Sequence, residues 1–212
     1  MTNSDLHLAN EHHFRQIAEL LPQLVWTCAA DGPCDYLSPQ WLRYTGKGED
    51  EQLGYGWLEQ LHPDDRPRVM DRWHATATSG ENFEIEFRIR RHDGVYRWFR
   101  TLAVPLRDES GQVVKWFGSN TDIDDLKRTE EALRESEERF RASVANASIG
   151  FAMTDPDGRF LDANPAYCAI TGYSVQELRS LGFQQLLHPD DRAENMALIE
   201  RMLAGDLSAF VV

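Results

Sequence analysis

Residues 82–91 read NFEIEFRIRR, and this stretch decides the fold of the first half of the chain. Large apolar residues alternate with charged ones, which is the pattern of an antiparallel strand with one buried face. The Asp93-Gly94 pair that follows predicts a hairpin turn, because it tolerates the positive φ angles that such turns require. Residues 95–109 and 112–120 then read as two more strands. The sequence therefore predicts a three-stranded meander, with Pro105 near an edge or bulge because it has no N–H.

Shorter elements precede this meander. Residues 24–38 read as two short strands around a turn at Asp31-Gly32-Pro33. Ser38 opens a short helix as its cap, and Gly46 stops that helix. Helices over one face of a five-stranded antiparallel sheet make an α+β domain, which we expect to span residues 23–122.

The hexapeptide LHPDDR occurs twice, at Leu61 and at Leu187, 126 residues apart. At the same offset, residues 14–66 and 140–192 align without a gap and share turns, caps and aromatic positions. A matched active site would preserve a few polar residues, whereas this match preserves the scaffold, so one fold is built twice. We therefore expect a second unit of the same kind over residues 144–212.

The offset also places Val212 level with Glu86, in the middle of a predicted strand. We therefore expect the second unit to be truncated at its C-terminus and the chain to be the N-terminal part of a longer protein. Two outer segments complete the expected organisation. Residues 1–22 predict an amphipathic helix, and residues 123–143 predict a helical connector, since they contain no Gly or Pro.

LHPDDR itself allows two interpretations. In the first it is scaffold: Pro63 precedes a helix whose first N–H groups are accepted by Asp64 or Asp65. In the second, His62, Asp64 and Asp65 belong to a metal-dependent hydrolase. The sequence offers no HExxH, no nucleophile elbow and no phosphate loop, so we favour the scaffold and expect no catalytic residue and no metal site.

Composition restricts the partners. The chain is 42% hydrophobic and 27% charged, as in globular proteins, with a net charge of -13 that disfavours nucleic acid. No run approaches the roughly 20 apolar residues of a membrane span, and the first residues lack the basic start and apolar core that a signal peptide would have. Cys28, Cys34 and Cys168 form no zinc pattern and read as small buried residues in a reducing compartment. We expect a cytoplasmic chain without membrane contact.

The connector carries a heptad pattern. Leu126, Leu133 and Phe140 recur every seven residues. This spacing predicts either a parallel coiled coil in a homodimer, which we favour, or a solvated linker helix. The apolar seam is short, which suits a joint that changes register during signalling.

The first unit resembles a PAS domain through RRHDGVYRWF (residues 90–99) and GQVVKWFGSNTDI (residues 111–123), and the second through DPDGRFLDANPAYCAITGYS (residues 155–174). The resemblance implies bacterial sensory modules upstream of a histidine kinase or diguanylate cyclase output domain. Asp122 and Ile123 resemble the family's Asp-Ile-Thr exit motif, in which Asp124 replaces Thr. The resemblance implies that these three residues relay a signal and that a basic residue of the core pairs with Asp122.

A small-molecule pocket is expected between the helices and the sheet of the first unit, near five aromatic residues: Trp41, Trp57, Phe83, Phe87 and Trp98. The flavin-photosensing members carry a cysteine within an Asn-Cys-Arg-Phe-Leu-Gln run, which this chain lacks. The haem-binding members use a histidine near the helix after HPDD, where His74 lies. A haem gas sensor using His74 is therefore an alternative to the sensory and dimerisation module.

Overall fold

The computed structural model describes residues 13–206, 208 and 209 of the 212-residue chain. Two compact units make up the chain, Met1–Glu131 and Ala132–Val212. Among the residues described, none of the helices combines the length and the apolarity needed to cross a bilayer.

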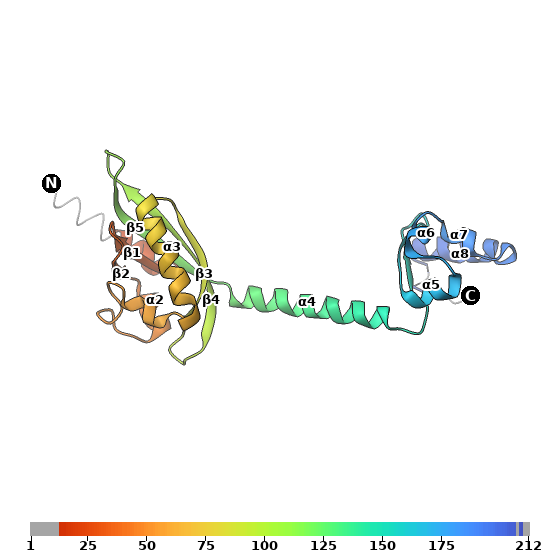
Figure 1. Cartoon of the computed structure of the whole chain (residues 1–212), viewed down its shortest axis with the longest axis horizontal. Helices are drawn as coiled ribbons and strands as arrows, with labels where there is room; N and C mark the ends of the chain where they lie inside the picture. Colours follow the sequence, from red (N-terminus) through yellow and green to blue (C-terminus); the bar gives the residue numbers. More distant parts are fainter. Residues whose placement is uncertain (1–12, 207, 210–212) are drawn as a thin grey trace. The chain divides into compact units, whose positions relative to one another are not determined.

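The first unit contains a five-stranded antiparallel sheet in the order β2-β1-β5-β4-β3 (Figure 1). Its strands are β1 (Leu24–Ala29), β2 (Cys34–Leu37), β3 (Phe83–Arg90), β4 (Tyr96–Arg107) and β5 (Val113–Asp122). The last three strands form the predicted meander, and the ladder between β4 and β5 shifts register just after Pro105, where a residue without an N–H is tolerated. The predicted α+β fold is confirmed.

Four helical segments follow one another between β2 and β3: α2 (Pro39–Thr45), η1 (Gly56–Gln60), η2 (Pro63–Asp65) and α3 (Arg66–Ser79). In Figure 1, α2 and α3 lie over the same face of the sheet. The core between these two layers contains Trp41, Trp73 and Trp116, all buried. The sequence buries them because Trp116 points inward from β5 while Trp73 shares the inner stripe of α3 with Val69 and Thr76.

The other face of the sheet carries the N-terminal helix. Residues 13–20 are helical, whereas the predicted start of this helix lies outside the described residues. Phe14 packs edge-on against Tyr36 and Phe117, whose ring centroids are 5.7 and 5.0 Å away. The Gln40 side chain donates to the Leu21 carbonyl at 2.8 Å, which satisfies one of the carbonyl groups that remain free at a helix end.

The second unit contains a two-stranded sheet, β6 (Ala152–Thr154) and β7 (Phe160–Ala163). Its helical segments are α5 (Pro165–Thr171), α6 (Val175–Arg179), α7 (Phe183–Leu186), η3 (Pro189–Asp191) and α8 (Arg192–Leu203). The two copies of LHPDDR have the same local geometry, since His62 and His188 each accept a hydrogen bond from the backbone two residues later. The helix α4 (Asp124–Ala145) makes the connector helical.

The two repeats differ at the residue that precedes their short helices, α2 and α5. Ser38 does not cap α2, because its hydroxyl accepts from the Val25 N–H at 3.1 Å instead. At the equivalent place, Asn164 accepts from the N–H groups of both Phe151 and Tyr167, so it caps α5 as well. The longer amide side chain reaches two donors where the serine hydroxyl reaches one, and the expected Ser38 cap was wrong.

Candidate sensory core and helix joint

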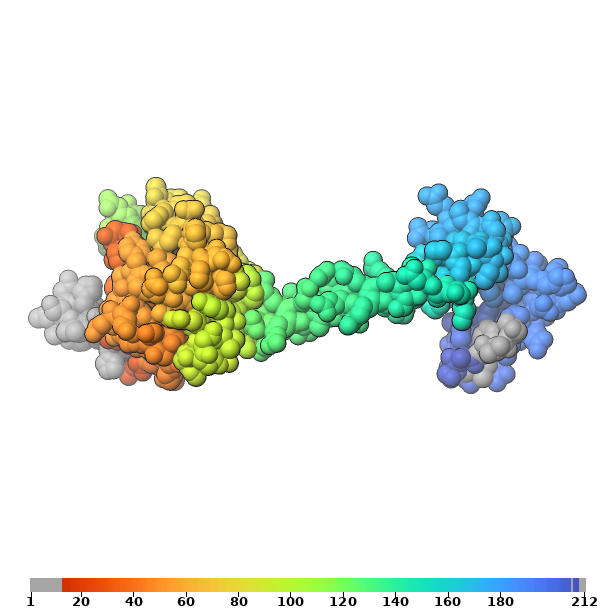
Figure 2. All heavy atoms as spheres, turned by 60° about the horizontal axis from the view of Figure 1, so that its bottom comes forward, coloured from red at the N-terminus to blue at the C-terminus, as the bar shows by residue number. Residues whose placement is uncertain are grey.

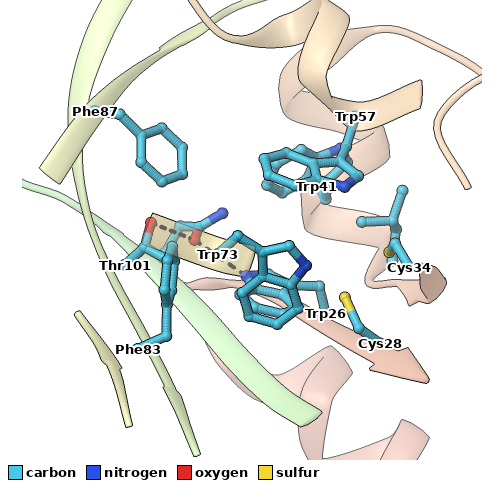
Figure 3. Close-up of a pocket in the computed structure, with 11 residues that line it drawn as sticks. Trp26, Cys28, Cys34, Trp41, Trp57, Trp73, Phe83, Phe87 and Thr101 are labelled. Carbon is cyan, nitrogen blue, oxygen red and sulfur yellow. Dashed lines mark hydrogen bonds between the residues drawn. The ribbon is translucent and has the colours of Figure 1, made fainter. Parts of the chain in front are cut away.

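A small cavity lies inside the first unit, between the sheet and the helices (Figure 3). Trp41, Trp57, Phe83 and Phe87 all line it, as expected from the sequence. It offers about 20 Å³ to the centre of a water-sized sphere, which is room for about one water molecule. The aromatic side chains therefore fill almost the whole space in which the sequence led us to expect a larger ligand.

Trp98 lies elsewhere. Its neighbour Phe99 is buried, and successive residues of a strand point to opposite faces, so Trp98 faces away from the core. Its ring lies 5.2 Å from the Arg88 guanidinium carbon and 5.0 Å from Lys127 Nζ, both within cation–π range. Trp98 therefore does not line the cavity, contrary to the prediction, and lies at the surface beside α4.

A polar group that the sequence analysis missed, Asn120, lies in the cavity wall. Asn120 Oδ1 accepts from Trp26 Nε1 at 3.1 Å and from Thr101 Oγ1 at 2.7 Å. These hydrogen bonds join β1, β4 and β5 across the floor of the cavity. The sequence could have indicated this position. Side chains alternate along a strand, so Asn120, four residues after the inward-facing Trp116, lies on the same inner face.

The Cys28 and Cys34 thiols also face the cavity and are buried, as expected, whereas Cys168 is only half-buried. The two residues are register partners across β1 and β2. A hydrogen bond to Cys34 and burial both raise the pKa of Cys28 well above its ordinary value. Both residues therefore act in this structure as small apolar residues of the cavity wall.

Asp65 of LHPDDR acts as a clamp and not as the expected helix cap. Its carboxylate accepts from the Arg88 backbone N–H at 3.0 Å and from the Arg88 guanidinium at 2.9 and 3.0 Å. Burial by itself would raise the pKa of Asp65, but these hydrogen bonds outweigh it and hold the pKa below its ordinary value. The ion pair between Asp65 and Arg88 connects the start of α3 to β3. Helix-capping preferences concern neighbours in the sequence and do not predict such a long-range contact.

The hydrolase alternative finds no support in this geometry. His62 Nδ1 accepts from the Asp64 backbone N–H at 3.3 Å, which makes it the cap of η2. Asp65 is occupied by Arg88, and no three His, Cys, Asp or Glu side chains in the described part of the chain gather closely enough to hold a metal ion. His62 and Asp65 thus hold local structure in this geometry: His62 caps η2, and Asp65 binds Arg88 in place of the helix cap expected of it.

His74 does not reach the cavity. It is exposed on α3, next to the buried Trp73. One residue along an α-helix turns the side chain by about 100°, so Trp73 faces the core and His74 faces solvent. Neither the position of His74 nor the size of the cavity fits a haem group in this structure.

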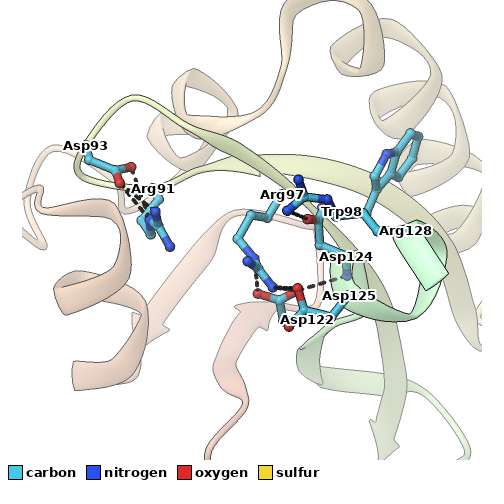
Figure 4. A network of polar contacts seen from close by, with 8 residues as sticks. All are labelled: Arg91, Asp93, Arg97, Trp98, Asp122, Asp124, Asp125 and Arg128. Atoms are coloured by element: carbon cyan, nitrogen blue, oxygen red, sulfur yellow. Dashed lines mark hydrogen bonds and ion pairs between the residues drawn. The ribbon is translucent and has the colours of Figure 1, made fainter. Parts of the chain in front are cut away.

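The end of β5 is tied to the start of α4 by Arg97 (Figure 4). Arg97 Nε donates to Asp122 at 2.7 Å, and its terminal nitrogen donates to Asp125 at 2.9 Å. Arg97 is thus the basic partner of Asp122 that the resemblance implied. The hydrogen bonds from Arg97 to Asp122 raise the pKa of the guanidinium above its ordinary value. We call Arg97, Asp122, Asp124 and Asp125 the helix joint.

Two more contacts fix the first turn of α4. Asp124 accepts from the Trp98 backbone N–H at 3.2 Å, and its own N–H donates to Asp122 at 3.0 Å. Lys127 forms an ion pair with Glu86 of β3 at 2.7 Å. The Asp124 carboxylate thus binds β4 rather than a helix N–H, and Asp122 is the residue that accepts the N–H at the start of α4.

The comparisons with known proteins agree with this geometry. A family model described as PAS fold matches residues 35–120, and a second model with the same description matches residues 144–212. The chain carries two PAS domains in tandem. The first PAS domain holds the cavity, and the helix joint lies at the end of its last strand.

The relatives are larger proteins. The uncharacterized protein y4lL of Sinorhizobium fredii is 36% identical over 88% of this chain, and the peroxide stress-activated histidine kinase mak1 of Schizosaccharomyces pombe is 33% identical over 89%. The chain spans only 22% and 12% of the lengths of these two relatives. A solved RNA-binding light-oxygen-voltage receptor shares the fold, with a TM-score of 0.53 over 60% of this chain and 37% of that chain at 19% identity.

The predicted seam of α4 is open to solvent in this PAS protein. Leu126, Leu133 and Phe140 are 59, 61 and 64% exposed, and the space-filling view shows the side chains of α4 along its surface (Figure 2). Three large apolar side chains on one face of one helix give it an amphipathic character. An exposed apolar stripe of this kind is typical of a surface that meets a partner helix.

Proposed function

We propose that this tandem PAS chain is a sensory and dimerisation module that passes a change in the core of its first domain through the helix joint to α4. The output domain, a histidine kinase or a diguanylate cyclase, lies outside this chain. The relationship to mak1, whose name describes a histidine kinase activated by peroxide stress, supports the signalling role. The proposed module binds no nucleic acid, which its net charge of -13 supports.

One observation carries this proposal: the cavity and the helix joint use the same two strands. Thr101 of the cavity wall and Arg97 of the joint both belong to β4, four residues apart. Asn120 and Asp122 both belong to β5, two residues apart, which is about 7 Å along a strand. Even spacing on a strand also places both members of each pair on the same face. A shift of Asn120 in the core therefore reaches Asp122 directly.

The homodimer is the second part of the proposal. The exposed seam of Leu126, Leu133 and Phe140 supports a parallel contact between two copies of α4. The free thiols of Cys28, Cys34 and Cys168 support a reducing compartment, and we place the module in the cytoplasm.

The relay is tested by removing the guanidinium of the joint. We predict that Arg97→Gln makes the amides of residues 124–130 exchange with solvent about three to ten times faster, because the first turn of α4 loses two charge-assisted contacts, one of them on an exposed carboxylate. Hydrogen exchange followed by mass spectrometry measures this. Arg91→Gln is the matched control, since Arg91 pairs with Asp93 in the hairpin away from α4 (Figure 4). Equal exchange of α4 in the two variants would refute the relay.

A further inference from the structure

The repeat places the same surface in both domains, and the two copies differ in how this surface is covered. In the first domain, the helix of residues 13–20 lies on the outer face of β1 and β2, where Phe14 packs beside the buried Val25 and Tyr36. The 126-residue offset maps this helix onto the last turns of α4. The end of α4 therefore corresponds to an N-terminal helix of the second domain.

The corresponding surface of the second domain is open. Phe151 is 46% exposed, whereas its counterpart Val25 is buried. Met153 is 51% exposed, whereas its counterpart Thr27 is buried. A groove of about 550 Å³ lies between the last turns of α4 and this face, and it is lined by Phe140, Phe151 and Met153. The second domain thus has both sides of the contact that is closed in the first domain, and it holds them apart.

Hydrogen bonds already hold the two sides of this groove together. Asn164 Nδ2 donates to the Val144 carbonyl at the end of α4 and to the Ile149 carbonyl, both at 2.9 Å. Val144 lies one turn after Phe140 on the same helix face and is half-buried. The helix backbone is therefore in place beside the sheet, and a change of rotamer at Phe140 is enough to alter the position of its ring.

The walls of the groove suit an aromatic ring but bind it less firmly than in the first domain. Phe151 offers an aromatic partner, and Met153 offers a thioether, which also packs favourably against rings. Asp162 takes the place of Tyr36, which packs edge-on against Phe14 in the first domain. The loss of this aromatic partner weakens the contact, and a weak contact can be made and broken reversibly.

We propose that the face of β6 that carries Met153 is a docking surface for the Phe140 ring of the same chain, and that docking there excludes Phe140 from the α4 seam. A seam residue inserts its side chain between residues of the partner helix, so one ring cannot be covered by β6 and by a partner helix at once. Separation of two α4 helices then frees Phe140 for its own domain. The inference deepens the proposed function, on which it rests for the seam, because the state of the connector reaches the second domain through this one ring.

The first experiment observes the docked ring by nuclear magnetic resonance of the full 212-residue chain, with ¹³C-labelled methionine methyl groups. The Met153 signal is assigned from its loss in Met153→Leu. In the monomer, we expect a nuclear Overhauser effect from ring protons to the Met153 methyl group that disappears in Phe140→Leu. Phe14→Leu is the matched control, because Phe14 has the same position in the first domain, and it should leave the effect unchanged. An effect that is absent from the monomer, or that persists in Phe140→Leu, would overturn the docking surface.

The second experiment tests the exclusion at a protein concentration where the wild-type chain is dimeric. Leu133→Glu weakens the seam, so it should strengthen the effect at Met153 and slow amide exchange in β6 and β7 about two- to fivefold, because the released Phe140 covers the sheet. Leu133→Met keeps the seam and should behave as the wild type. Dissociation in Leu133→Glu without either change would overturn the exclusion.

The two experiments separate a failure of this inference from a failure of the proposed function. Light scattering that finds a monomer at every concentration would remove the homodimer from the proposed function, and the exclusion with it. The docking of Phe140 on β6 would still be decided by the comparison of Phe140→Leu with Phe14→Leu, which needs no dimer.

Discussion

Asp65 and Asp191 occupy the same place in the two copies of LHPDDR and have different surroundings. Asp65 is 5% exposed and is bound by Arg88 of β3, whereas Asp191 is exposed. The pair of residues therefore offers one buried carboxylate bound by an arginine and one exposed carboxylate.

We predict that Asp65→Asn lowers the free energy of unfolding of the first PAS domain by about 1–3 kcal/mol at neutral pH, because Arg88 is left half-buried without its carboxylate. Since the folded state lowers the pKa of Asp65, this contribution is present above the unfolded pKa of about 3.9 and is lost as the pH falls through the folded value. Urea unfolding at several pH values measures it. Asp191→Asn should change stability by less than about 0.5 kcal/mol, and an equal loss in both variants would contradict the clamp.

Gly118 is the residue that lets Trp26 lie across the sheet. A Cβ atom at this position would overlap the indole ring of Trp26. We predict that Gly118→Ala costs about 1–3 kcal/mol, because Trp26 must move and its hydrogen bond to Asn120 is lost. Thermal unfolding measures the loss. Gly48→Ala is the control, since a Cβ there meets only the end of the Glu51 side chain, and a similar loss in both variants would exclude the steric explanation.

For single residues, the sequence predicted which side chains face the core better than it predicted which side chains bind one another. Four of the five aromatic residues expected at the cavity line it, because alternation along β3 and helical spacing fix which way a side chain points. The prediction for Trp98 was wrong, because its neighbour Phe99 takes the position that faces the core. The partners of Asp65 and Arg97 are 23 and 25 residues away in the sequence, and pairing at such distances depends on strand register, which local patterns do not specify.

The elements themselves were largely predictable. The meander follows from period-two alternation and an Asp-Gly turn, both of which are local signals. The place of β5 between β1 and β4 is a non-local result that no segment of the sequence indicates by itself. The cap of α2 shows a similar limit, since Ser38 has a backbone partner on β1 that competes with capping.

The helix α4 gives the prediction at this scale. We expect Leu133→Glu to reduce the dimeric fraction of the chain, because it replaces an apolar seam contact with two like charges that face each other. Light scattering at several protein concentrations measures the mass. Leu133→Met keeps the seam apolar and should preserve the dimer. An unchanged mass in Leu133→Glu would leave α4 as a solvated linker helix.

Across the whole molecule, the apolar core is distributed unevenly. Among the described residues, the second unit buries only Phe160 and Leu178 as large apolar side chains, and its sheet has two strands. Two-stranded sheets are marginal in water unless other elements cover them. We predict that amides between Gly150 and Leu203 exchange faster than those between Val25 and Trp73. Equal protection in a monomer would show that the second unit is stable as it stands.

All six tryptophans of the chain belong to the first PAS domain. Trp73 lies 5.7 Å from Trp26 and 5.4 Å from Trp116, measured between ring centroids. Indole rings this close couple their electronic transitions, and the tryptophan contribution to the near-ultraviolet circular dichroism and to the intrinsic fluorescence originates in the first domain alone, whereas the second domain contributes through Tyr167 and Tyr173. The second domain is optically silent above the tyrosine band. In a single sample, tryptophan fluorescence therefore follows the unfolding of the first domain. Ellipticity in the amide region follows the unfolding of both domains.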